Sequence, residues 1–166
     1  PIIDFHGHLC PGLVIGYRAA KAGMKRIHAM RSKNEELVAI VENDSCAVDA
    51  IQVMTGCTFG KGNFFFKDYG KHVYTLALRP DGRGVRVSLK NDVFREEDRG
   101  ERIKLILELD DDQLFDIKDV TIELPQQAQI HNSVACHNCG ERVMETRIKE
   151  KNKDVYCIPC FYEKFY

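Results

Sequence analysis

The sequence predicts an α+β protein: an N-terminal domain of helices packed on a mainly antiparallel sheet, followed by a small zinc-binding module. Three observations support this fold class. Residues 11–30 carry apolar side chains at helical spacing, residues 64–90 contain alternating segments typical of strands, and two Cys-x-x-Cys motifs follow residue 135. Because 166 residues suffice for one medium domain and a small appendage, we place the domains at residues 1–130 and 131–166.

The first elements expected along the chain are a helix and a buried strand. Pro11 suits the first position of a helix, because the N–H that proline lacks would have no partner there. Leu13 and Tyr17 begin an apolar series with helical spacing, which predicts a helix over residues 11–30. The short apolar run over residues 37–41 contains β-branched side chains and predicts a buried strand.

A second helix and a set of strands come next. Polar residues 43–45 offer side chains that cap helices, so we expect a helix over residues 46–55. A glycine-rich loop over residues 56–63 leads into three segments that alternate in the manner of antiparallel strands, with a turn at Asp81-Gly82 between the second and the third. The three expected strands are residues 64–69, 72–79 and 85–90.

The last part of the N-terminal domain is predicted to be helical. Charged residues 95–104 open a helix that ends before the acidic run 110–112, and residues 112–120 are expected to form another short helix. Residues 121–133 are polar, contain Pro125 and lack a helical period, which is typical of a linker. The domain boundary is therefore placed within this linker.

The four cysteines of the two Cys-x-x-Cys pairs have the spacing of a structural zinc site. Seventeen residues separate the pairs, and each pair turns tightly enough to point two sulfur atoms at one centre. Four thiolates complete the tetrahedral coordination of Zn2+, and so short a segment buries too little apolar surface to fold without a metal. Paired redox motifs or an iron site are the alternatives. The expected zinc ligands are Cys136, Cys139, Cys157 and Cys160.

A second group of metal-ligating residue types lies near the N-terminus. His6, His8 and Cys10 alternate along the chain, so in an extended segment they share one face. Cys10 immediately precedes the first expected helix, and a helix N-terminus stabilises a thiolate. Cys46 stands at the start of the next expected helix. If the two helix starts converge, His8, Cys10 and Cys46 hold a second metal, and their nitrogen and sulfur donors favour zinc, nickel or iron.

The glycine-rich loop adds Cys57 and Lys61 to this candidate metal or substrate site. Lys61 on such a loop either binds an anionic substrate or is solvated, and a single cysteine such as Cys57 is more often an apolar core residue. A phosphate-binding P-loop is excluded, because only three residues separate Gly56 from Gly60, Gly62 replaces the Ser or Thr that binds magnesium, and the loop follows a helix.

Three motifs together resemble the FmdE family of formylmethanofuran dehydrogenase accessory proteins: HGHLCPG at residues 6–12, DAIQ at residues 49–52 and GCTFGKGN at residues 56–63. The resemblance extends over residues 5–124, and the tail resembles the treble-clef or ribbon zinc module that some members carry. It implies an α+β N-terminal domain and a homodimer. It also implies an accessory place beside molybdenum or tungsten enzymes in anaerobic one-carbon metabolism, of which methanogenesis is an example.

The resemblance implies a metal or substrate site at His8, Cys10, Cys46 and Cys57, with a small molecule as substrate, and it names no reaction. We therefore expect a metal-binding accessory protein or a metal-dependent enzyme. Two other functions stay open. One is a regulator whose zinc module binds nucleic acid or a protein partner, and the other is a thiol-redox protein that uses its N-terminal cysteines without a metal.

Charge and composition bear on these alternatives. With 24 basic and 25 acidic residues the net charge is −1, which gives no general attraction for nucleic acid. Lysines 149, 151 and 153 favour a basic patch on the tail, but acidic residues interleave with them. Seven cysteines, an odd number with two metal-type pairs, indicate a reducing compartment, so we expect a cytoplasmic protein without a membrane segment or secretory leader.

Overall fold

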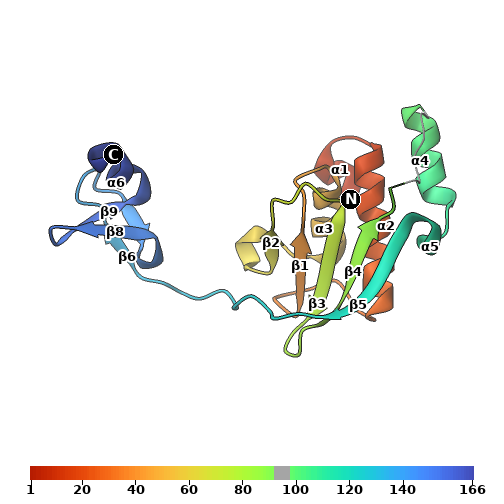
Figure 1. Cartoon of the computed structure of the whole chain (residues 1–166), viewed down its shortest axis with the longest axis horizontal. Coiled ribbons are helices and arrows are strands. Elements are labelled where there is room, and N and C mark those ends of the chain that lie inside the picture. The colour runs from red at the N-terminus through yellow and green to blue at the C-terminus, as the bar shows by residue number, and fades with distance from the viewer. Residues whose placement is uncertain (92–97) are drawn as a thin grey trace. The chain divides into compact units, whose positions relative to one another are not determined.

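The structure is a computed structural model that describes residues 1–91 and 98–166. It divides into two compact units, Pro1–Ala128 and Gln129–Tyr166, and residues 122–132 have no regular secondary structure (Figure 1). The first unit is a layer of helices on a five-stranded sheet, and the second consists of two small hairpins and a helix, so the expected α+β class is confirmed. None of the described helices has the length and apolar composition needed to cross a membrane.

The first unit is built on one mixed sheet. Its elements, in chain order, are α1 (Ile2–His6), α2 (Pro11–Arg26), β1 (Leu37–Val41), α3 (Ala47–Thr55), the 3-10 helix η1 (Phe59–Lys61), β2 (Phe64–Phe66), β3 (Val73–Leu78), β4 (Arg83–Leu89), α4 (Arg99–Glu108), α5 (Asp111–Leu114) and β5 (Phe115–Thr121). The strand order is β2-β1-β3-β4-β5. All neighbouring strands are antiparallel except β1 and β2, which are parallel.

The parallel pair corrects one prediction. We expected residues 64–69 to form an antiparallel strand, but β2 runs in the same direction as β1, with Ala39 opposite Phe64. The reason is the connection between them: α3 and η1 carry the chain back along the sheet, so that β2 enters beside β1 in the same direction, as in other crossover units. The expectation of antiparallel strands is right for β3 and β4.

The core of the first unit lies between the sheet and the helices α2 and α3. Both helices pack on the same face of the sheet, and they contact each other closely. A Cβ atom at Gly23 of α2 would lie 3.0 Å from the side chain of Leu76 and 3.4 Å from those of Val85 and Val87, so the absence of a side chain lets the helix approach β3 and β4. The strand β1 is buried along its whole length, as its apolar run predicts.

A buried arginine joins α2 to the end of α4. The guanidinium group of Arg18 donates to the backbone carbonyls of Ile106, Leu107 and Leu109, and it forms an ion pair with Asp111 at 2.8 Å. The last carbonyls of a helix have no partners within the helix, and a cation also suits that end of the helix dipole. Arg18 therefore fixes the C-terminal end of α4 against α2.

Three predicted helices differ in extent from the observed ones. The first ends at Arg26 rather than residue 30, because His28 adopts a left-handed backbone conformation (φ 52°) that a helix does not continue through. The predicted helix over 112–120 is wrong beyond Leu114, where β5 begins. Residues 95–97, part of the charged run predicted to open a helix that ends before residue 110, lie outside the described residues. The observed helix α4 begins after Asp98, whose side chain caps it, and ends at Glu108.

The second unit has little secondary structure. Its elements are β6 (Ser133–Ala135), β7 (Arg142–Met144), the 3-10 helix η2 (Glu145–Arg147), β8 (Ile148–Lys151), β9 (Asp154–Cys157) and α6 (Ile158–Phe165). β6 pairs with β7 and β8 pairs with β9, both antiparallel. A first hairpin, a second hairpin and a helix in this order are the arrangement of a treble clef, one of the two module types expected from the sequence.

Candidate metal centres

The four cysteines of the second unit converge on one point. Cys136 and Cys139 lie in the turn between β6 and β7, Cys157 ends β9, and Cys160 lies in the first turn of α6. Their sulfur atoms all lie within 4.8 Å of one another, and those of Cys139 and Cys157 are 4.0 Å apart. Two sulfur ligands of a tetrahedral zinc ion are about 3.8 Å apart when each Zn–S bond is about 2.3 Å. The four side chains therefore fit a tetrahedral metal ion such as zinc.

The ionisation of the four thiols is also consistent with a bound cation. Backbone N–H groups of Cys139 and Cys157 point at the sulfur of Cys136 and lower the pKa of that thiol to about 6. The pKa of Cys139 is raised to about 12: the N–H of Glu141 acts to lower it, but burial and the three neighbouring thiols outweigh that effect. Because one thiolate opposes the ionisation of the next, a bound metal ion would favour the form in which all four thiols are deprotonated.

A metal also replaces a core that the second unit lacks. Its buried apolar residues are the three cysteines Cys136, Cys157 and Cys160 together with Tyr156, and a few half-buried side chains such as Phe161 and Phe165 pack around them. So small a cluster supplies little hydrophobic stabilisation, and domains of this size depend on disulfides or metals. The cluster is therefore suited to a metal ion such as zinc.

A second cluster joins the end of α1 to the starts of α2 and α3 in the first unit. His6 is the last residue of α1, Cys10 is the N-cap of α2, and Cys46 is the N-cap of α3. One ligand atom from each lies within 4.8 Å of the other two, and the Nε2 atom of His6 is 3.8 Å from the sulfur of Cys10. Nitrogen and sulfur ligands of one tetrahedral zinc ion are about 3.6 Å apart. The three side chains therefore fit a metal with an incomplete protein coordination sphere.

Asp49 holds His6 in the orientation that a metal ligand needs. Its Oδ2 atom lies 2.7 Å from Nδ1 of His6, so Nδ1 carries the hydrogen and Nε2 is left facing Cys10. Metal-binding histidines commonly donate their other ring nitrogen to a carboxylate in this way, which fixes the ring and increases its basicity. Asp49 lies three residues after Cys46 on α3, so one helix supplies both a ligand and the residue that orients another.

The loops around Cys10 and Cys46 explain how the cluster forms. Gly7 ends α1 in a left-handed conformation (φ 93°), which turns the chain from His6 back toward Cys10. A Cβ atom at Gly12 would lie 3.3 Å from the Cβ of Cys46, so this glycine lets the start of α2 approach the start of α3. Burial and the neighbouring Cys10 thiol raise the pKa of Cys46, which a bound cation would reverse.

The turn before Cys46 is held by the buried side chain of Asn43. Its amide oxygen accepts hydrogen bonds from the backbone N–H and the hydroxyl of Ser45, at 3.1 and 2.8 Å. Its amide nitrogen donates to the backbone carbonyl of Lys71 at 2.7 Å. The turn is thereby tied to the segment before β3, and Cys46 has a fixed backbone position.

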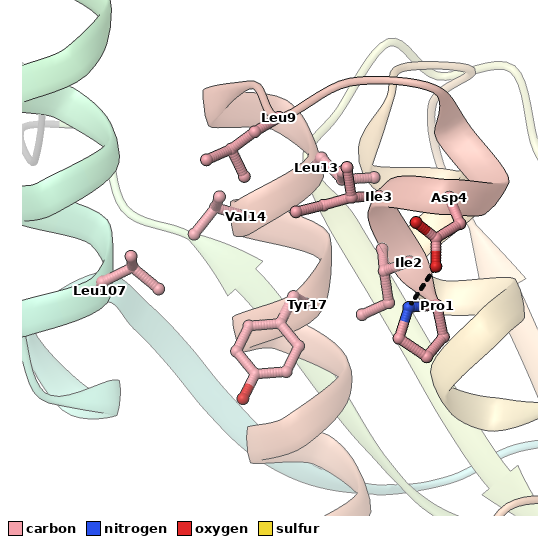
Figure 2. Close-up of a pocket in the computed structure, with 9 residues that line it drawn as sticks. All are labelled: Pro1, Ile2, Ile3, Asp4, Leu9, Leu13, Val14, Tyr17 and Leu107. Carbon is pink, nitrogen blue, oxygen red and sulfur yellow. Dashed lines mark ion pairs between the residues drawn. The ribbon is translucent and has the colours of Figure 1, made fainter.

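Two cavities lie near this cluster. The first, of about 330 Å³, opens beside His6, Cys46 and Asp49 and is otherwise lined by Asn43, Asp44, Ser45, Val48 and three phenylalanines, Phe59, Phe64 and Phe66. The second, of about 400 Å³, lies between α1, α2 and Leu107 of α4 and is almost wholly apolar (Figure 2). Of these two cavities, the first combines metal-ligating side chains with space for a small molecule.

A family model described as "FmdE, Molybdenum formylmethanofuran dehydrogenase operon" matches residues 5–154. The chain belongs to the FmdE family. This match confirms the resemblance seen in the sequence motifs, and it extends beyond the first unit into the zinc module.

Two relatives of this FmdE-family chain are informative. A protein of Archaeoglobus fulgidus described as a "Probable S-adenosyl-L-methionine-binding protein" is 30% identical over 189 residues, which cover 95% of this chain and 50% of that protein. The chain thus spans about half the length of this curated relative. A crystal structure of a tungsten formylmethanofuran dehydrogenase FmdE-like protein from Syntrophus aciditrophicus superposes with a TM-score of 0.71 at 23% identity, covering 99% of this chain and 90% of that one, and shows a shared fold.

The structure brings together two of the three ligands predicted for the second metal, Cys10 and Cys46, and adds His6 in place of His8. His8 is exposed, and its ring lies against that of His6 with centroids 4.6 Å apart. The prediction assumed an extended segment, whereas residues 2–6 form α1. The pairing of His6 with Asp49 could not be foreseen from sequence, because the two residues are 43 positions apart.

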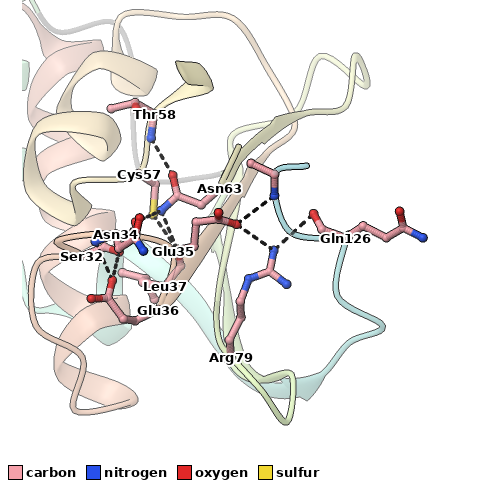
Figure 3. A network of polar contacts seen from close by, with 11 residues as sticks. Ser32, Asn34, Glu35, Glu36, Leu37, Cys57, Thr58, Asn63, Arg79 and Gln126 are labelled. Atoms are coloured by element: carbon pink, nitrogen blue, oxygen red, sulfur yellow. Dashed lines mark hydrogen bonds and ion pairs between the residues drawn. The ribbon is translucent and has the colours of Figure 1, made fainter. Parts of the chain in front are cut away.

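Cys57 and Lys61 have structural partners instead, and neither lines the cavity beside the cluster. Cys57 is fully buried, donates its S–H to the carbonyl of Leu37 at 3.2 Å, and has a pKa raised by burial. The ammonium group of Lys61 donates to the carbonyl of Ser32 at 3.2 Å. Figure 3 shows the contact of Cys57 with Leu37, whose carbonyl also accepts a hydrogen bond from Asn63.

The glycines of the loop over residues 56–63 serve close backbone approach rather than phosphate binding. A Cβ atom at Gly56 would meet the carbonyl oxygen of Ser32, and one at Gly62 would lie 2.8 Å from the Cβ of Ala128. Ala128 itself donates its N–H to Glu35, near the ion pair of Glu35 with Arg79 (Figure 3). The loop therefore supports the segment that leaves the first unit.

Proposed function

We propose that the protein binds two transition metal ions with different roles. A structural zinc ion is held by the four cysteines of the second unit. A second, exchangeable metal ion is held by His6, Cys10 and Cys46 in the first unit, where the adjacent cavity admits a small molecule. Zinc, nickel and iron are the metals that such nitrogen and sulfur donors favour.

The observation that carries this proposal is the arrangement of His6. Its Nδ1 atom lies 2.7 Å from Asp49 and its Nε2 atom lies 3.8 Å from Cys10, so the ring is oriented on one side and presents a ligand atom on the other. With three protein ligands, one coordination position is left for substrate or water. A bound metal would supply a Lewis acid at that position, while Asp49 holds the ring and the cavity wall confines the ligand.

Membership of a family described by a molybdenum formylmethanofuran dehydrogenase operon supports an accessory role beside a molybdenum or tungsten enzyme. A homodimer and a cytoplasmic location remain part of this proposal.

The second candidate function is thiol-redox chemistry. It is supported by the closeness of Cys10 and Cys46, whose sulfur atoms are among the ligand atoms within 4.8 Å of one another.

The test is metal stoichiometry of the full chain, purified under anaerobic and reducing conditions and titrated with Zn2+, Ni2+ and Fe2+. We expect two metal ions per chain, of which a mild chelator removes one. His6→Gln and Cys10→Ser should each reduce the number to one. His8→Gln and Cys57→Ser are matched controls that should keep two.

Two results would count against the proposal. Two metals that persist in both His6→Gln and Cys10→Ser would place the second ion elsewhere. One metal in the unaltered chain, with Cys10 and Cys46 found as a disulfide after mild oxidation, would favour the redox function.

A further inference from the structure

We infer that the cavity beside His6, Cys46 and Asp49 takes a small planar ligand that is neutral or cationic and carries a nitrogen or sulfur donor, and that it rejects anions. This inference rests on the proposed second metal, because the donor atom would occupy its open coordination position. It extends that proposal by naming the class of ligand that the cavity binds. Three features carry it: the aromatic wall, the charges of the lining, and the way its polar groups are already used.

The aromatic wall consists of Phe59, Phe64 and Phe66. Phe64 is buried, and its ring centroid lies 5.5 Å from that of Phe59. Phe59 and Phe66 are 68% and 42% exposed, which is unusual for such large apolar side chains. Exposed aromatic rings gathered at a cavity offer a stacking surface for a flat molecule.

The charged residues of the lining are all acidic except for the histidine. Asp44 and Asp49 line the cavity, and among the residues that the structure describes the lining contains no lysine or arginine. Two thiolates at Cys10 and Cys46 balance the charge of a divalent metal, so Asp44 and Asp49 leave the site negative. Lys61 does not line the cavity, and its ammonium group lies at the carbonyl of Ser32. A phosphate or carboxylate ligand would therefore be repelled.

Three polar side chains of the lining, those of Asn43, Ser45 and Asp49, are engaged within the protein. The amide oxygen of Asn43 accepts a hydrogen bond from the Ser45 hydroxyl at 2.8 Å, and its amide nitrogen donates to the backbone carbonyl of Lys71. Asp49 accepts from His6. Selection therefore depends on stacking, on charge and on the metal rather than on several hydrogen bonds. A volume of about 330 Å³ is near the small end of ligand pockets and suits a molecule of one or two rings.

The experiment uses the full chain with zinc in the tail and Co2+ in the second site, because the visible absorption of thiolate-bound Co2+ reports a new ligand. The ligands are benzimidazole, the smaller imidazole with the same donor, and the anionic benzimidazole-5-carboxylate. We expect benzimidazole to bind about three- to tenfold more tightly than imidazole through stacking. We expect the carboxylate to bind about tenfold more weakly than benzimidazole near neutral pH.

Substitutions assign these preferences to residues. Phe59→Leu and Phe66→Leu should bring the affinities for benzimidazole and imidazole closer together while Co2+ binding stays intact. Asp44→Asn should improve binding of the carboxylate selectively. Phe5→Leu changes another exposed phenylalanine, which does not line the cavity, and should alter neither preference.

The outcomes separate the two proposals. If no Co2+ binds at the second site, the proposed function fails before any ligand is added. If Co2+ binds but the carboxylate binds as well as benzimidazole, or the phenylalanine substitutions leave the affinity ratio unchanged, the ligand class is wrong. If those substitutions change the oligomeric state and not the ratio, the exposed rings meet a second copy of the chain, which also overturns the inference.

Discussion

At the scale of single residues, one carboxylate organises the loop that precedes β1. Glu36 accepts a hydrogen bond from the hydroxyl of Ser32 at 2.7 Å and another from the backbone N–H of Asn34 at 2.9 Å (Figure 3). The bond from Ser32 is the main cause that lowers the pKa of Glu36 from 4.5 to about 2. The backbone carbonyl of Ser32 in the same loop accepts a hydrogen bond from Lys61, so the conformation of this loop supports the segment over residues 56–63 as well.

The lowered pKa of Glu36 predicts how stability depends on pH. A carboxyl whose folded pKa is below its unfolded pKa stabilises the fold above about pH 4.5, and this contribution is lost as the pH falls toward about 2. Glu36→Gln should therefore lower the denaturation midpoint of the first unit near neutral pH, and the difference from the unaltered protein should shrink below pH 4.5. Urea denaturation across this pH range measures it.

The control for this prediction is Glu123→Gln, at an exposed position outside the helices and strands. It should change the midpoint little at any pH. A difference between Glu36→Gln and the unaltered protein that stays constant as the pH falls would mean that the Ser32 and Asn34 bonds do not depend on the charge.

The metal ligands show what single-residue patterns can and cannot predict. The four tail cysteines were predictable because both members of each pair lie in one tight turn, so spacing alone brings their sulfur atoms together. The choice between His6 and His8 could not be predicted, because it depends on whether α1 forms and on whether Gly7 ends that helix. Asp49, which selects His6, reaches it only through the packing of α1 on α3.

At the scale of elements, the crossing of α2 and α3 brings the candidate ligands Cys10 and Cys46 together. A Cβ atom at Gly16 of α2 would overlap the backbone carbonyl of Ala47, the first residue of α3. The glycine is therefore required for the close approach of the two helices. Since Cys46 precedes Ala47 directly, the distance between the helices also sets the position of that sulfur.

Gly16→Ala tests this crossing. In an unconstrained helix the change would stabilise the protein by about 1 kcal/mol, because alanine has the higher helix propensity. Here the new methyl group overlaps backbone, which cannot move alone, so we expect a net loss of about 1–3 kcal/mol of unfolding free energy. Second-site metal affinity should fall as well, because α3 and Cys46 are displaced. Denaturant unfolding and metal titration measure the two effects.

Gly60→Ala is the matched control, since a Cβ atom there would meet nothing within 4 Å and the backbone has no left-handed strain. Its unfolding free energy and metal affinity should stay close to those of the unaltered protein. Equal effects of the two substitutions would show that helix contact is not what makes Gly16 important.

Elements whose sequence pattern is local were predicted better than those that depend on partners. The start of α2 at Pro11 and the limits of β1 agree with the prediction, because a proline and an apolar run mark them directly. The direction of β2 could not be predicted, since it depends on which strand it joins. β5 was taken for a helix because the alternation that begins at Phe115 is broken at Asp119 and Val120, in a strand at the edge of the sheet.

At the scale of the whole molecule, the two units have separate sources of stability. The first has a core of helices on a sheet, with Leu37, Tyr74, Leu76 and Ile106 almost completely buried. The second has four buried residues, three of which are cysteines of the metal cluster. Removal of a metal ligand should therefore have a local effect in the second unit and little effect on the first.

Cys139→Ser tests this independence. Cys139 is an exposed ligand with few packing contacts of its own, so its replacement removes metal coordination more than core volume. We expect limited proteolysis to degrade the tail and leave a stable fragment that ends near Ala128, the last residue of the first unit. The main thermal transition should shift little, and a strong chelator should produce the same fragment from the unaltered chain.

Cys46→Ser, which removes a thiol from the first unit, is the control and should leave the tail resistant to proteolysis. A tail that resists proteolysis in both Cys139→Ser and chelator would show that its fold does not depend on the metal, because the small cluster around Tyr156 would then suffice on its own.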